Sequence, residues 1–322
     1  MEKILITGAL GQIGTELITH LQGLYGKDNI IATSILAPNA PKDYHDFLYE
    51  DLDVTDANAI FDLTKKHRVD TVIHLAALLS AVGENNPGLL WNVNMNGLYN
   101  VLEVARQEKI AVFTPSSIAA FGPSTPPDHT PQETIQRPTT IYGVSKVAGE
   151  LLCDYYHSKF GVDTRGVRYP GLISNAALPG GGTTDYAVHI YYDALRKGHF
   201  ECELDPKTQM DMMYMPDALN AIVQMMEADP SKFTHRNAYN ITAMSFTPEV
   251  IYKAIQKHIP EFSINYNVNA MKQAIANSWP NSLDDSAARE EWGWNPVYDL
   301  ESMTIDMLSK LKTKFDKEAQ SK

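Results

Sequence analysis

Short apolar runs alternate with amphipathic stretches along the first half of the chain. The runs at 3–7, 29–35 and 71–78 consist mostly of apolar residues, and stretches with apolar side chains at helical spacing lie between them. Strands that are apolar on both faces and alternate with helices are typical of a parallel sheet covered by helices on both sides. The pattern therefore predicts an α/β fold built on a doubly wound parallel sheet.

The alternation becomes less regular after residue 169, where short strands mix with helices. We therefore expect a nucleotide-binding domain over 1–170 and a smaller mixed α/β substrate-binding lobe over 171–322, with a chain that can cross back between them. The spacing of apolar residues predicts helices over 11–26, 56–67, 89–109, 142–160, 184–197, 216–228, 248–258 and, at the surface, 303–322; further strands are expected at 110–116, 163–169, 237–242 and 262–266.

A glycine-rich turn joins the first expected strand to the first expected helix. The stretch "TGALGQIG" places Gly8, Gly11 and Gly14 there, with Gln12 and Ile13 among them. Glycines let the backbone approach a pyrophosphate closely, and the amino end of a helix offers unpaired N–H groups and a favourable dipole. The alternative is a turn that only packs the helix on the strand, but the strand–turn–helix setting favours a dinucleotide site.

The second strand ends in Ser34, at the place where an acidic residue usually holds the adenosine ribose of NAD. A serine hydroxyl can still hydrogen-bond the ribose, although more weakly than a carboxylate. No arginine follows within 35–44 to bind the 2′-phosphate of NADP, so we expect NAD as the cofactor. Asp53, with Val54 beside it, is expected to contact the adenine; alternatively, Asp53 only begins the next helix.

The strongest catalytic pattern is "TIYGVSK", in which Tyr142 and Lys146 lie four residues apart. On a helix they share one face, and a lysine ammonium beside a phenol favours the phenolate, which is a usable general base. The "PSS" segment places Ser116 and Ser117 at the carboxyl end of a strand, where ligands of such sheets bind. We expect Ser117 to orient the substrate oxygen. A Tyr-x-x-x-Lys pair also occurs by chance in helices, but its agreement with the other motifs favours a catalytic site.

With these motifs the chain resembles the extended short-chain dehydrogenase/reductases, a Rossmann family that includes nucleotide-sugar epimerases and dehydratases. The resembling stretches are "TGALGQIG", "HLAA", "PSSIAAFG", "YGVSK" and "RYPGLI". The resemblance covers essentially the whole chain and implies that Ser117, Tyr142 and Lys146 form the catalytic triad. It also implies cofactor contacts from the 8–14 turn, Leu75, Ala76, Ala77, Ser116, Tyr142, Lys146 and the segment Tyr169 to Gly171.

Within this family the chain is similar to the short-chain L-threonine 3-dehydrogenases. The similarity rests on "HLAALLSAVGE", "TPSSIAAFGPSTP", "PGGGTTDYAV", "MMYMPDA" and "SWPNSLDDSAAREEWGW". It implies oxidation of L-threonine at Cβ to 2-amino-3-oxobutanoate, with the hydride going to NAD and Tyr142 acting as general base. Ser80, Thr183 and Thr184 would contact the amino acid. A homodimer through the helices at 89–109 and 142–160 is also implied.

The residues of the stretch "LPGGGTTDYA" at 178–187 also indicate a binding element, independently of the resemblance. Its glycines suit either a mobile linker or a backbone that approaches a ligand closely. Thr183 is expected to cap the following helix, whose amino end offers N–H and hydroxyl donors to a carboxylate. Asp185 in the first turn would attract an ammonium group. Together with Ser117 and Tyr142, this stretch is the expected binding element for an amino acid.

Composition excludes several other kinds of ligand. Lys and Arg number 27 against 39 Asp and Glu, a net charge of −12 that disfavours nucleic acid and anionic membranes.

No apolar run reaches the ~18 residues of a membrane span, and the histidines show no metal-ligand spacing. Cys153 and Cys202 lie far apart, which fits free thiols, and a strand at Lys3 leaves no room for a leader peptide. We therefore expect a cytoplasmic enzyme without a metal site.

Two alternatives remain open at the level of sequence. A nucleotide-sugar epimerase or dehydratase binds a diphosphate, which usually requires arginine, and from residue 171 onward the chain has only Arg196, Arg236 and Arg289. A protein of another class, a non-enzymatic regulator, would sense the dinucleotide and act on a partner. The intact catalytic pattern argues against this second alternative.

Overall fold

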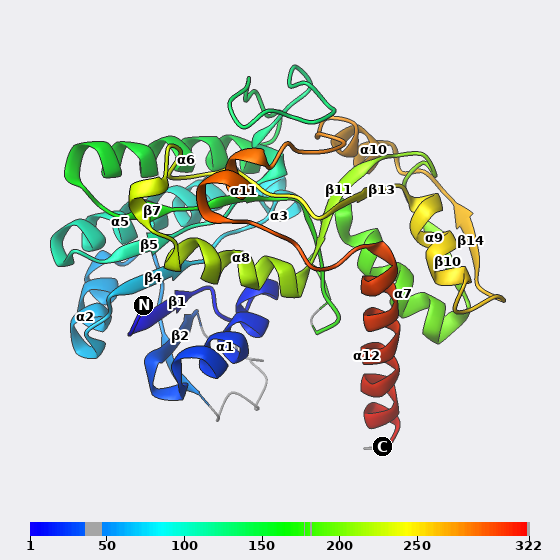
Figure 1. Cartoon of the computed structure of the whole chain (residues 1–322), viewed down its shortest axis with the longest axis horizontal. Helices are drawn as coiled ribbons and strands as arrows, with labels where there is room; N and C mark the ends of the chain where they lie inside the picture. Colours follow the sequence, from blue (N-terminus) through cyan, green and yellow to red (C-terminus); the bar gives the residue numbers. More distant parts are fainter. Residues whose placement is uncertain (36–46, 177, 181, 321–322) are drawn as a thin grey trace.

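The computed structural model describes residues 1–35, 47–176, 178–180 and 182–320. At its centre is a six-stranded parallel sheet in the order β3-β2-β1-β4-β5-β7 (Figure 1). From β1 the strand order runs both ways, so a crevice opens beside β1 and β4 at the carboxyl ends of the strands. The strands are β1 (Ile4–Thr7), β2 (Ile30–Ser34), β3 (Leu48–Asp51), β4 (Thr71–His74), β5 (Ala111–Phe113) and β7 (Thr164–Arg165).

Helices cover both faces of this sheet, namely α1 (Gln12–Tyr25), α2 (Ala57–His67), α5 (Gly97–Glu108), α6 (Ile141–Phe160) and α8 (Met215–Glu227). Successive side chains of a strand point to opposite faces. Ile4 and Ile6 accordingly pack with α1 and α8, whereas Leu5 packs with α2, α5 and α6. The doubly wound α/β fold predicted from the alternation of apolar runs is therefore confirmed.

Two expected strands are each split in a way that shapes the crevice. The run at 110–116 breaks before Pro115, which has no N–H to donate to a sheet. The run at 163–169 breaks at Gly166, where a Cβ atom would lie 2.4 Å from Thr114 O. The second halves of both runs leave the main sheet and pair with each other, with Ser117 opposite Tyr169.

One expected helix is also interrupted. In place of a single helix over 89–109, the chain forms α4 (Pro87–Trp91), a π-helical turn (Asn92–Asn96) and α5. The Asn94 side chain accepts a hydrogen bond from Leu78 N (2.8 Å) and donates one to Leu78 O (3.1 Å). The wider turn therefore places Asn94 against the loop that follows β4, and such π-helical turns are frequent at functional sites.

Three small sheets extend the molecule beyond the carboxyl ends of the main strands. The first contains the split halves and continues the crevice, and the other two belong to the C-terminal lobe. Their strands are β6 (Ser116–Ser117), β8 (Val167–Tyr169) and β12 (Tyr239–Asn240); β9 (Gly171–Ile173), β11 (Met210–Tyr214) and β13 (Met244–Phe246); and β10 (His199–Cys202) and β14 (Ser263–Tyr266).

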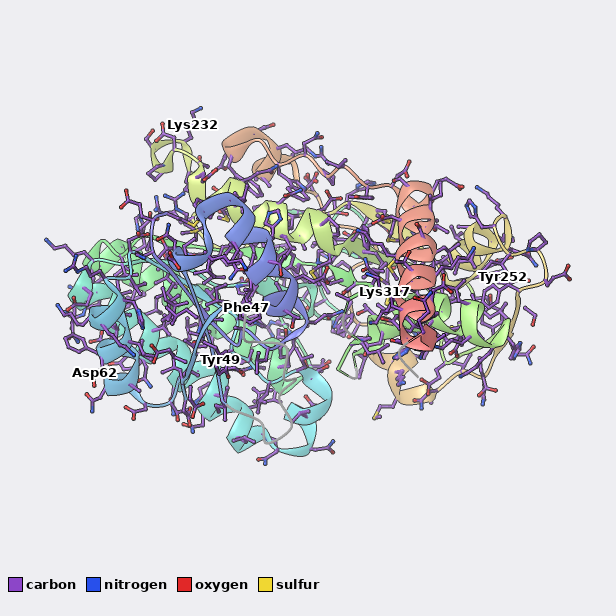
Figure 2. All side chains as sticks on the ribbon, turned by 90° about the horizontal axis from the view of Figure 1, so that it is seen from below. Phe47, Tyr49, Asp62, Lys232, Tyr252 and Lys317 are labelled. Carbon is purple, nitrogen blue, oxygen red and sulfur yellow. The ribbon has the colours of Figure 1, made fainter. Side chains whose placement is uncertain are left out.

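The C-terminal lobe has its own apolar core, which α7 (Tyr186–Lys197), α9 (Pro248–Gln256) and α12 (Leu300–Gln320) form with β10 and β11. Seen from below, Tyr252 and Lys317 lie at this end of the molecule and Tyr49 and Asp62 at the other (Figure 2). The segment that carries α8 and β12 instead returns to the main sheet, because α8 packs on α1 and β12 pairs with β8. The remaining helices are α3 (Ser80–Asn85), α10 (Ala270–Ala276) and α11 (Ser286–Trp292).

The last helix differs from its expected form. A surface helix was expected over 303–322, but α12 begins at Leu300 and buries Met303, Met307 and Leu311 in the core of the lobe. These residues recur at three- and four-residue spacing, so one face of the helix is apolar. No helix in the described part of the chain combines the length and apolar character that crossing a bilayer requires.

Candidate active site

A cavity of about 260 Å³ opens at the crevice, between the main sheet and the C-terminal lobe. Segments from the whole length of the chain line it, from the glycine turn to residue 279. It brings together most of the residues expected at the site: Gly8, Gly11, Gln12, Ile13, Gly14, Leu75, Ala77, Ser80, Ser116, Ser117, Tyr142, Lys146, Tyr169, Thr183, Thr184 and Asp185.

The glycine turn forms a cradle at one end of this active-site cavity. Gly8 has a φ of +65°, and a Cβ atom there would lie 2.6 Å from Ala76 N; a Cβ atom on Gly14 would lie 2.6 Å from a backbone oxygen. Gly11 precedes α1 without a side-chain cap, and Gln12 Nε2 is buried with no hydrogen-bond partner in the described part of the chain. Open N–H groups and an unpaired amide at the amino end of a helix fit the pyrophosphate of a dinucleotide.

The residues expected at the adenosine lie outside the lining of the cavity. Ser34 ends β2, and its carbonyl oxygen accepts a hydrogen bond from the Tyr49 hydroxyl (3.1 Å). Asp53 Oδ1 accepts from Thr55 N (2.9 Å) and Thr55 Oγ1 (2.8 Å), and Val54 is buried. The Asp53 carboxylate is thus engaged in a local turn. Residues 36–44, most of the stretch 35–44 that contains no arginine, lie outside the described residues.

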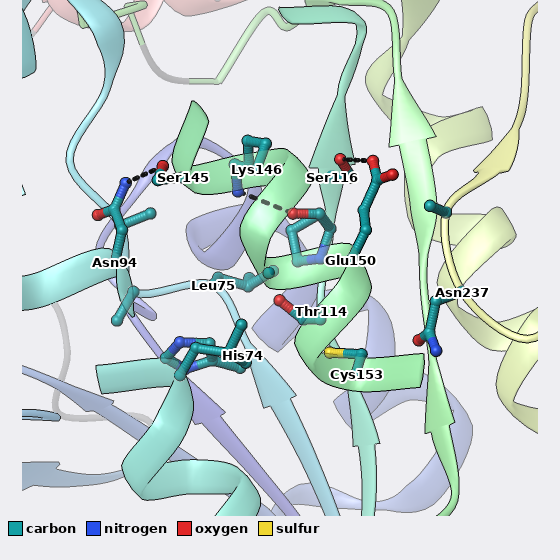
Figure 3. Close-up of a pocket in the computed structure, with 16 residues that line it drawn as sticks. His74, Leu75, Asn94, Thr114, Ser116, Ser145, Lys146, Glu150, Cys153 and Asn237 are labelled. Carbon is teal, nitrogen blue, oxygen red and sulfur yellow. Dashed lines mark hydrogen bonds between the residues drawn. The ribbon is translucent and has the colours of Figure 1, made fainter. Parts of the chain in front are cut away.

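The loop after β4 passes directly beside the cradle. Leu75 and Ala77 line the active-site cavity, and Ser80 lines it from the start of α3. Ala76 lines a second cavity of about 40 Å³, whose other lining residues include His74, Ser145 and Glu150 (Figure 3). Lys146 lines both cavities, so the smaller one adjoins the catalytic helix.

His74, at the end of β4, also lines the smaller cavity. Its Nδ1 atom shares a hydrogen bond with Thr7 Oγ1 (2.8 Å). Burial, with a smaller contribution from the charge of Lys146, lowers the pKa of His74 to about 3. The imidazole is therefore neutral at physiological pH and supports the ends of β1 and β4.

Ser117, Tyr142 and Lys146 all line the active-site cavity. Thr140 caps α6 by accepting a hydrogen bond from Gly143 N (3.0 Å), which places Tyr142 in the first turn. The Lys146 ammonium lies 5.4 Å from the centre of the Tyr142 ring and donates to Pro115 O (2.8 Å). The arrangement joins a phenol, a cation and the Ser117 hydroxyl at one wall, which is suited to moving a proton to or from a substrate oxygen.

A buried ion pair supports this wall from behind. Glu150 lies one helical turn after Lys146, and its carboxylate accepts hydrogen bonds from Arg168 Nε (3.0 Å), Arg168 Nη2 (2.8 Å) and Gln136 Nε2 (2.8 Å). The Ser116 hydroxyl donates to the same carboxylate (Figure 3). The hydroxyl of Ser116, which we expected at the cofactor, is therefore engaged with α6, and the ion pair fixes β6 and β8 relative to the catalytic helix.

Tyr169 contributes to the cavity without its hydroxyl group. The hydroxyl donates to Ala218 O (2.6 Å), inside the core that α8 forms with the sheet. Burial raises the pKa of Tyr169 well above its usual value. This side chain therefore stays neutral and offers an apolar surface.

Residues 183–185 line the cavity from the C-terminal lobe. They make a short 3-10 helix that leads into α7, and Gly182 precedes it as the capping residue, in place of the expected Thr183. Asp185 Oδ2 accepts from Gly182 N (2.5 Å), and Asp185 N donates to Gly182 O (3.3 Å). Thr184 packs on Gly171, where a Cβ atom would lie 2.9 Å from Thr184 Cβ. The middle glycine of the expected stretch, at 181, lies outside the described residues.

Several residues that line the active-site cavity were not predicted from the sequence. Trp279 is the most distant of them in sequence, and it packs against Ile118, Phe121 and Leu283. Its stretch is a loop before α11, and no periodicity or spacing relates it to the catalytic motifs. The other lining residues that were not expected are Leu79, Pro115, Ile118 and Leu172, whereas Pro170 and Gly171 belong to the segment expected at the cofactor.

Comparison with known proteins shows related chains of the same length. The model of the NAD dependent epimerase/dehydratase family matches residues 4–242. An uncharacterized epimerase/dehydratase of Staphylococcus aureus (strain MRSA252) is 56% identical over 314 residues, 98% of each chain. Among solved structures, an L-threonine dehydrogenase from Clostridium difficile is 58% identical with a TM-score of 0.96 over 98% of both chains. One from Phytophthora infestans is 50% identical with a TM-score of 0.93, over 97% of this chain and 100% of that one.

Proposed function

This chain belongs to the NAD dependent epimerase/dehydratase family, and we propose that within it the chain is an L-threonine 3-dehydrogenase. It oxidises L-threonine at Cβ to 2-amino-3-oxobutanoate. The observation that carries the proposal is the single cavity that joins Ser117, Tyr142 and Lys146 to the glycine cradle on one side and to residues 183–185 on the other. The similarity to L-threonine dehydrogenases over both lobes supports the same substrate.

NAD is the cofactor of this family, and the cradle fits it. Gly8, Gly11 and Gln12 would hold the pyrophosphate, because the glycines let the backbone approach it closely and the Gln12 side-chain amide is without a partner among the described residues. When bound, NAD supplies the acceptor for the hydride that leaves the substrate Cβ. The other residues proposed to contact it are Ile13, Gly14, Ser34, Asp53, Val54, Leu75, Ala76, Ala77, Ser116, Tyr142, Lys146 and Tyr169.

The catalytic wall handles the proton of the substrate hydroxyl. The Tyr142 phenolate takes this proton, and the Lys146 ammonium favours the phenolate because a positive charge lies close to the ring. The hydrogen bond from Lys146 to Pro115 O holds the ammonium in place. The Ser117 hydroxyl donates to the same substrate oxygen and orients it.

The opposite end of the cavity binds the amino-acid part of the substrate. Thr183 and Thr184 at the amino end of the short helix donate to the carboxylate, and Asp185 attracts the ammonium. Ser80 contacts the substrate from the loop after β4. In this proposal residues 171–322 form the substrate lobe, while the α8–β12 segment returns to the nucleotide-binding domain of residues 1–170.

The lining of the cavity favours an amino acid over a sugar nucleotide. Lys146 is the only lysine or arginine among the described residues that line it. A nucleotide diphosphate usually requires arginine pairs, and the one cation present already faces Tyr142. A purely regulatory dinucleotide sensor would not need the three catalytic groups to converge.

Formation of NADH, followed by absorbance at 340 nm, tests the proposal. The purified chain is given NAD or NADP with L-threonine, L-serine or a UDP-sugar. We expect turnover with L-threonine and NAD, and kcat/KM lower by at least about tenfold for L-serine, which lacks one methyl group. Turnover of the UDP-sugar alone would support an epimerase or dehydratase, and NAD binding without turnover would support a sensor.

We also propose that the chain forms a homodimer in the cytoplasm through α5 and α6. These helices expose a row of apolar side chains: Tyr99, Leu151, Tyr155 and Phe160 are between 42% and 63% exposed. Such a contiguous patch is typical of an interface. The cytoplasm fits because Cys153 and Cys202 are both free and buried. Light scattering on wild type and on Leu151→Glu tests the dimer, and equal masses near that of one chain would contradict it.

A further inference from the structure

Residues 279–283 lie in a loop of the C-terminal lobe that reaches the active-site cavity through Trp279. Trp279 lines the cavity, and four residues later Leu283 joins the same apolar cluster as Ile118. Ile118 directly follows the proposed catalytic residue Ser117. The position of the Trp279 indole therefore depends on what holds this segment in place.

The segment is held mainly by backbone hydrogen bonds to a second loop and to one carboxylate. Ser282 O accepts from Thr130 N (2.9 Å), and Asn281 N donates to Pro127 O (2.7 Å). Leu283 N, at the centre of the cluster, donates to Asp211 Oδ2 (2.8 Å). The side chains of Ser245 and Asp128 bind Asn281 in the same segment, and Asp211 is the side chain that binds Leu283 within the apolar cluster.

Asp211 lies on β11 and has no exposed surface. Its second carboxylate oxygen accepts a hydrogen bond from the Thr242 hydroxyl. Burial raises the pKa of this carboxyl to about 7, with a smaller contribution from Asp285. An ionisable group in such surroundings is unfavourable unless its hydrogen bonds compensate, and one of those bonds goes to Leu283, in the cluster that contains Ile118 and packs against Trp279.

We propose that Asp211 is a positioning residue, which accepts from Leu283 N and thereby fixes Trp279 and Ile118 at the substrate end of the cavity. Asp211 itself does not touch the substrate. The inference rests on the proposed function for the identity of the substrate, but the structural link from Asp211 to residues 279–283 does not.

The chain offers a matched control for this test. Asp217 on α8 is also buried, and its carboxylate accepts from Val297 N (2.9 Å) and Tyr298 N (3.0 Å). It therefore makes the same kind of contact with another loop of the C-terminal lobe. Neither Asp217 nor residues 297–298 line the active-site cavity.

The experiment compares Asp211→Ala, Asp211→Asn and Asp217→Ala with wild type, all saturated with NAD. We expect Asp211→Ala to raise the KM for L-threonine by about tenfold or more, because a hydrogen bond to a charged acceptor is lost. The Kd for NADH should stay within about twofold. Asp211→Asn should restore the KM, since its amide oxygen can accept from Leu283 N, and Asp217→Ala should leave it unchanged.

Amide hydrogen exchange provides a readout that does not depend on activity. Exchange within residues 279–286 should accelerate in Asp211→Ala and return to the wild-type rate in Asp211→Asn. Unchanged exchange there, or an equal rise in KM in Asp217→Ala, would overturn the proposal. If Asp211→Ala does not fold, Asp211→Ser replaces it, since its side chain is too short to reach Leu283 N. A wild type that forms no NADH from L-threonine would overturn the proposed function, whereas the exchange result would still decide the role of Asp211.

Discussion

The Lys146 ammonium lies one helical turn from Tyr142, 5.4 Å from the centre of its ring. A hydrogen bond to Pro115 O (2.8 Å) fixes the ammonium from the strand side. Pro115 also lies between β5 and β6, where the strand is broken. Its carbonyl oxygen binds the Lys146 ammonium, and Ser117, just after the break, lines the cavity. Two of the proposed catalytic residues, Ser117 and Lys146, are thus positioned beside this break in the sheet.

Tyr142→Phe should remove the base and leave the fold intact. We expect kcat with L-threonine to fall by at least about 10²-fold, which is the usual contribution of a general base. The Kd for NADH should remain close to that of wild type. Tyr155→Phe is the matched control, because Tyr155 lies on the same helix but is half exposed and does not line the cavity. Near-normal activity of Tyr142→Phe would exclude Tyr142 as the base.

Gly14→Ala should impair dinucleotide binding. The new Cβ atom would lie 2.6 Å from Ala9 O, so the start of α1 must shift away from the turn. We expect the Kd for NADH, measured by fluorescence, to rise by about tenfold or more. Gly23→Ala on the same helix is the control, since no atom lies within 4 Å of its Cβ position. It should stabilise the helix slightly, and an equal effect of both changes on NADH binding would argue against the cradle.

Removing one partner of the buried ion pair behind the catalytic wall should destabilise the protein. Arg168→Ala leaves the Glu150 carboxylate buried without its main donor, and both side chains are only 7% exposed. We expect a loss of about 3–5 kcal/mol in the free energy of unfolding, measured in urea. Lys253→Ala breaks an exposed pair with Glu249 and should change little. Similar losses in the two variants would contradict this account of the ion pair.

The stability of Asp211→Asn relative to wild type should depend on pH. The folded-state pKa of Asp211 is about 7, above the ordinary 3.8. The stability that this group contributes is therefore complete at pH below about 4 and declines as the pH rises toward 7. Asparagine does not ionise and avoids this decline, so the Tm of Asp211→Asn minus that of wild type should grow by a few degrees between about pH 5 and pH 8. A difference that is the same at every pH would contradict the burial of a titrating carboxyl.

Local patterns were sufficient to predict the main sheet and most of the candidate site. The apolar runs that became β1 and β4 are continuous because helices cover both faces, and the glycine turn lies within a few residues of β1. Tyr142 and Lys146 share a helix face, so their proximity follows from helical spacing alone. These features depend on contacts between residues close in sequence.

The remaining features depend on contacts that sequence spacing does not encode. Trp279 lines the cavity from a loop whose Leu283 N is bound to Asp211, which lies 72 residues earlier in the chain. The Ser116 hydroxyl donates to the Glu150 carboxylate, which is also held by Arg168. The π-helical turn at Asn94 arises from bonds to Leu78 in a separate loop. In each case a tertiary contact overrides the local pattern.

L-threonine carrying deuterium at Cβ tests the central claim most directly. Incubation with NAD and the wild-type enzyme, followed by mass spectrometry of the reduced cofactor, shows where the hydride comes from. Transfer from Cβ predicts reduced cofactor that is one mass unit heavier, together with 2-amino-3-oxobutanoate or its decarboxylation product. Reduced cofactor without deuterium, or no reduction at all, would contradict the claim that this chain oxidises L-threonine at Cβ.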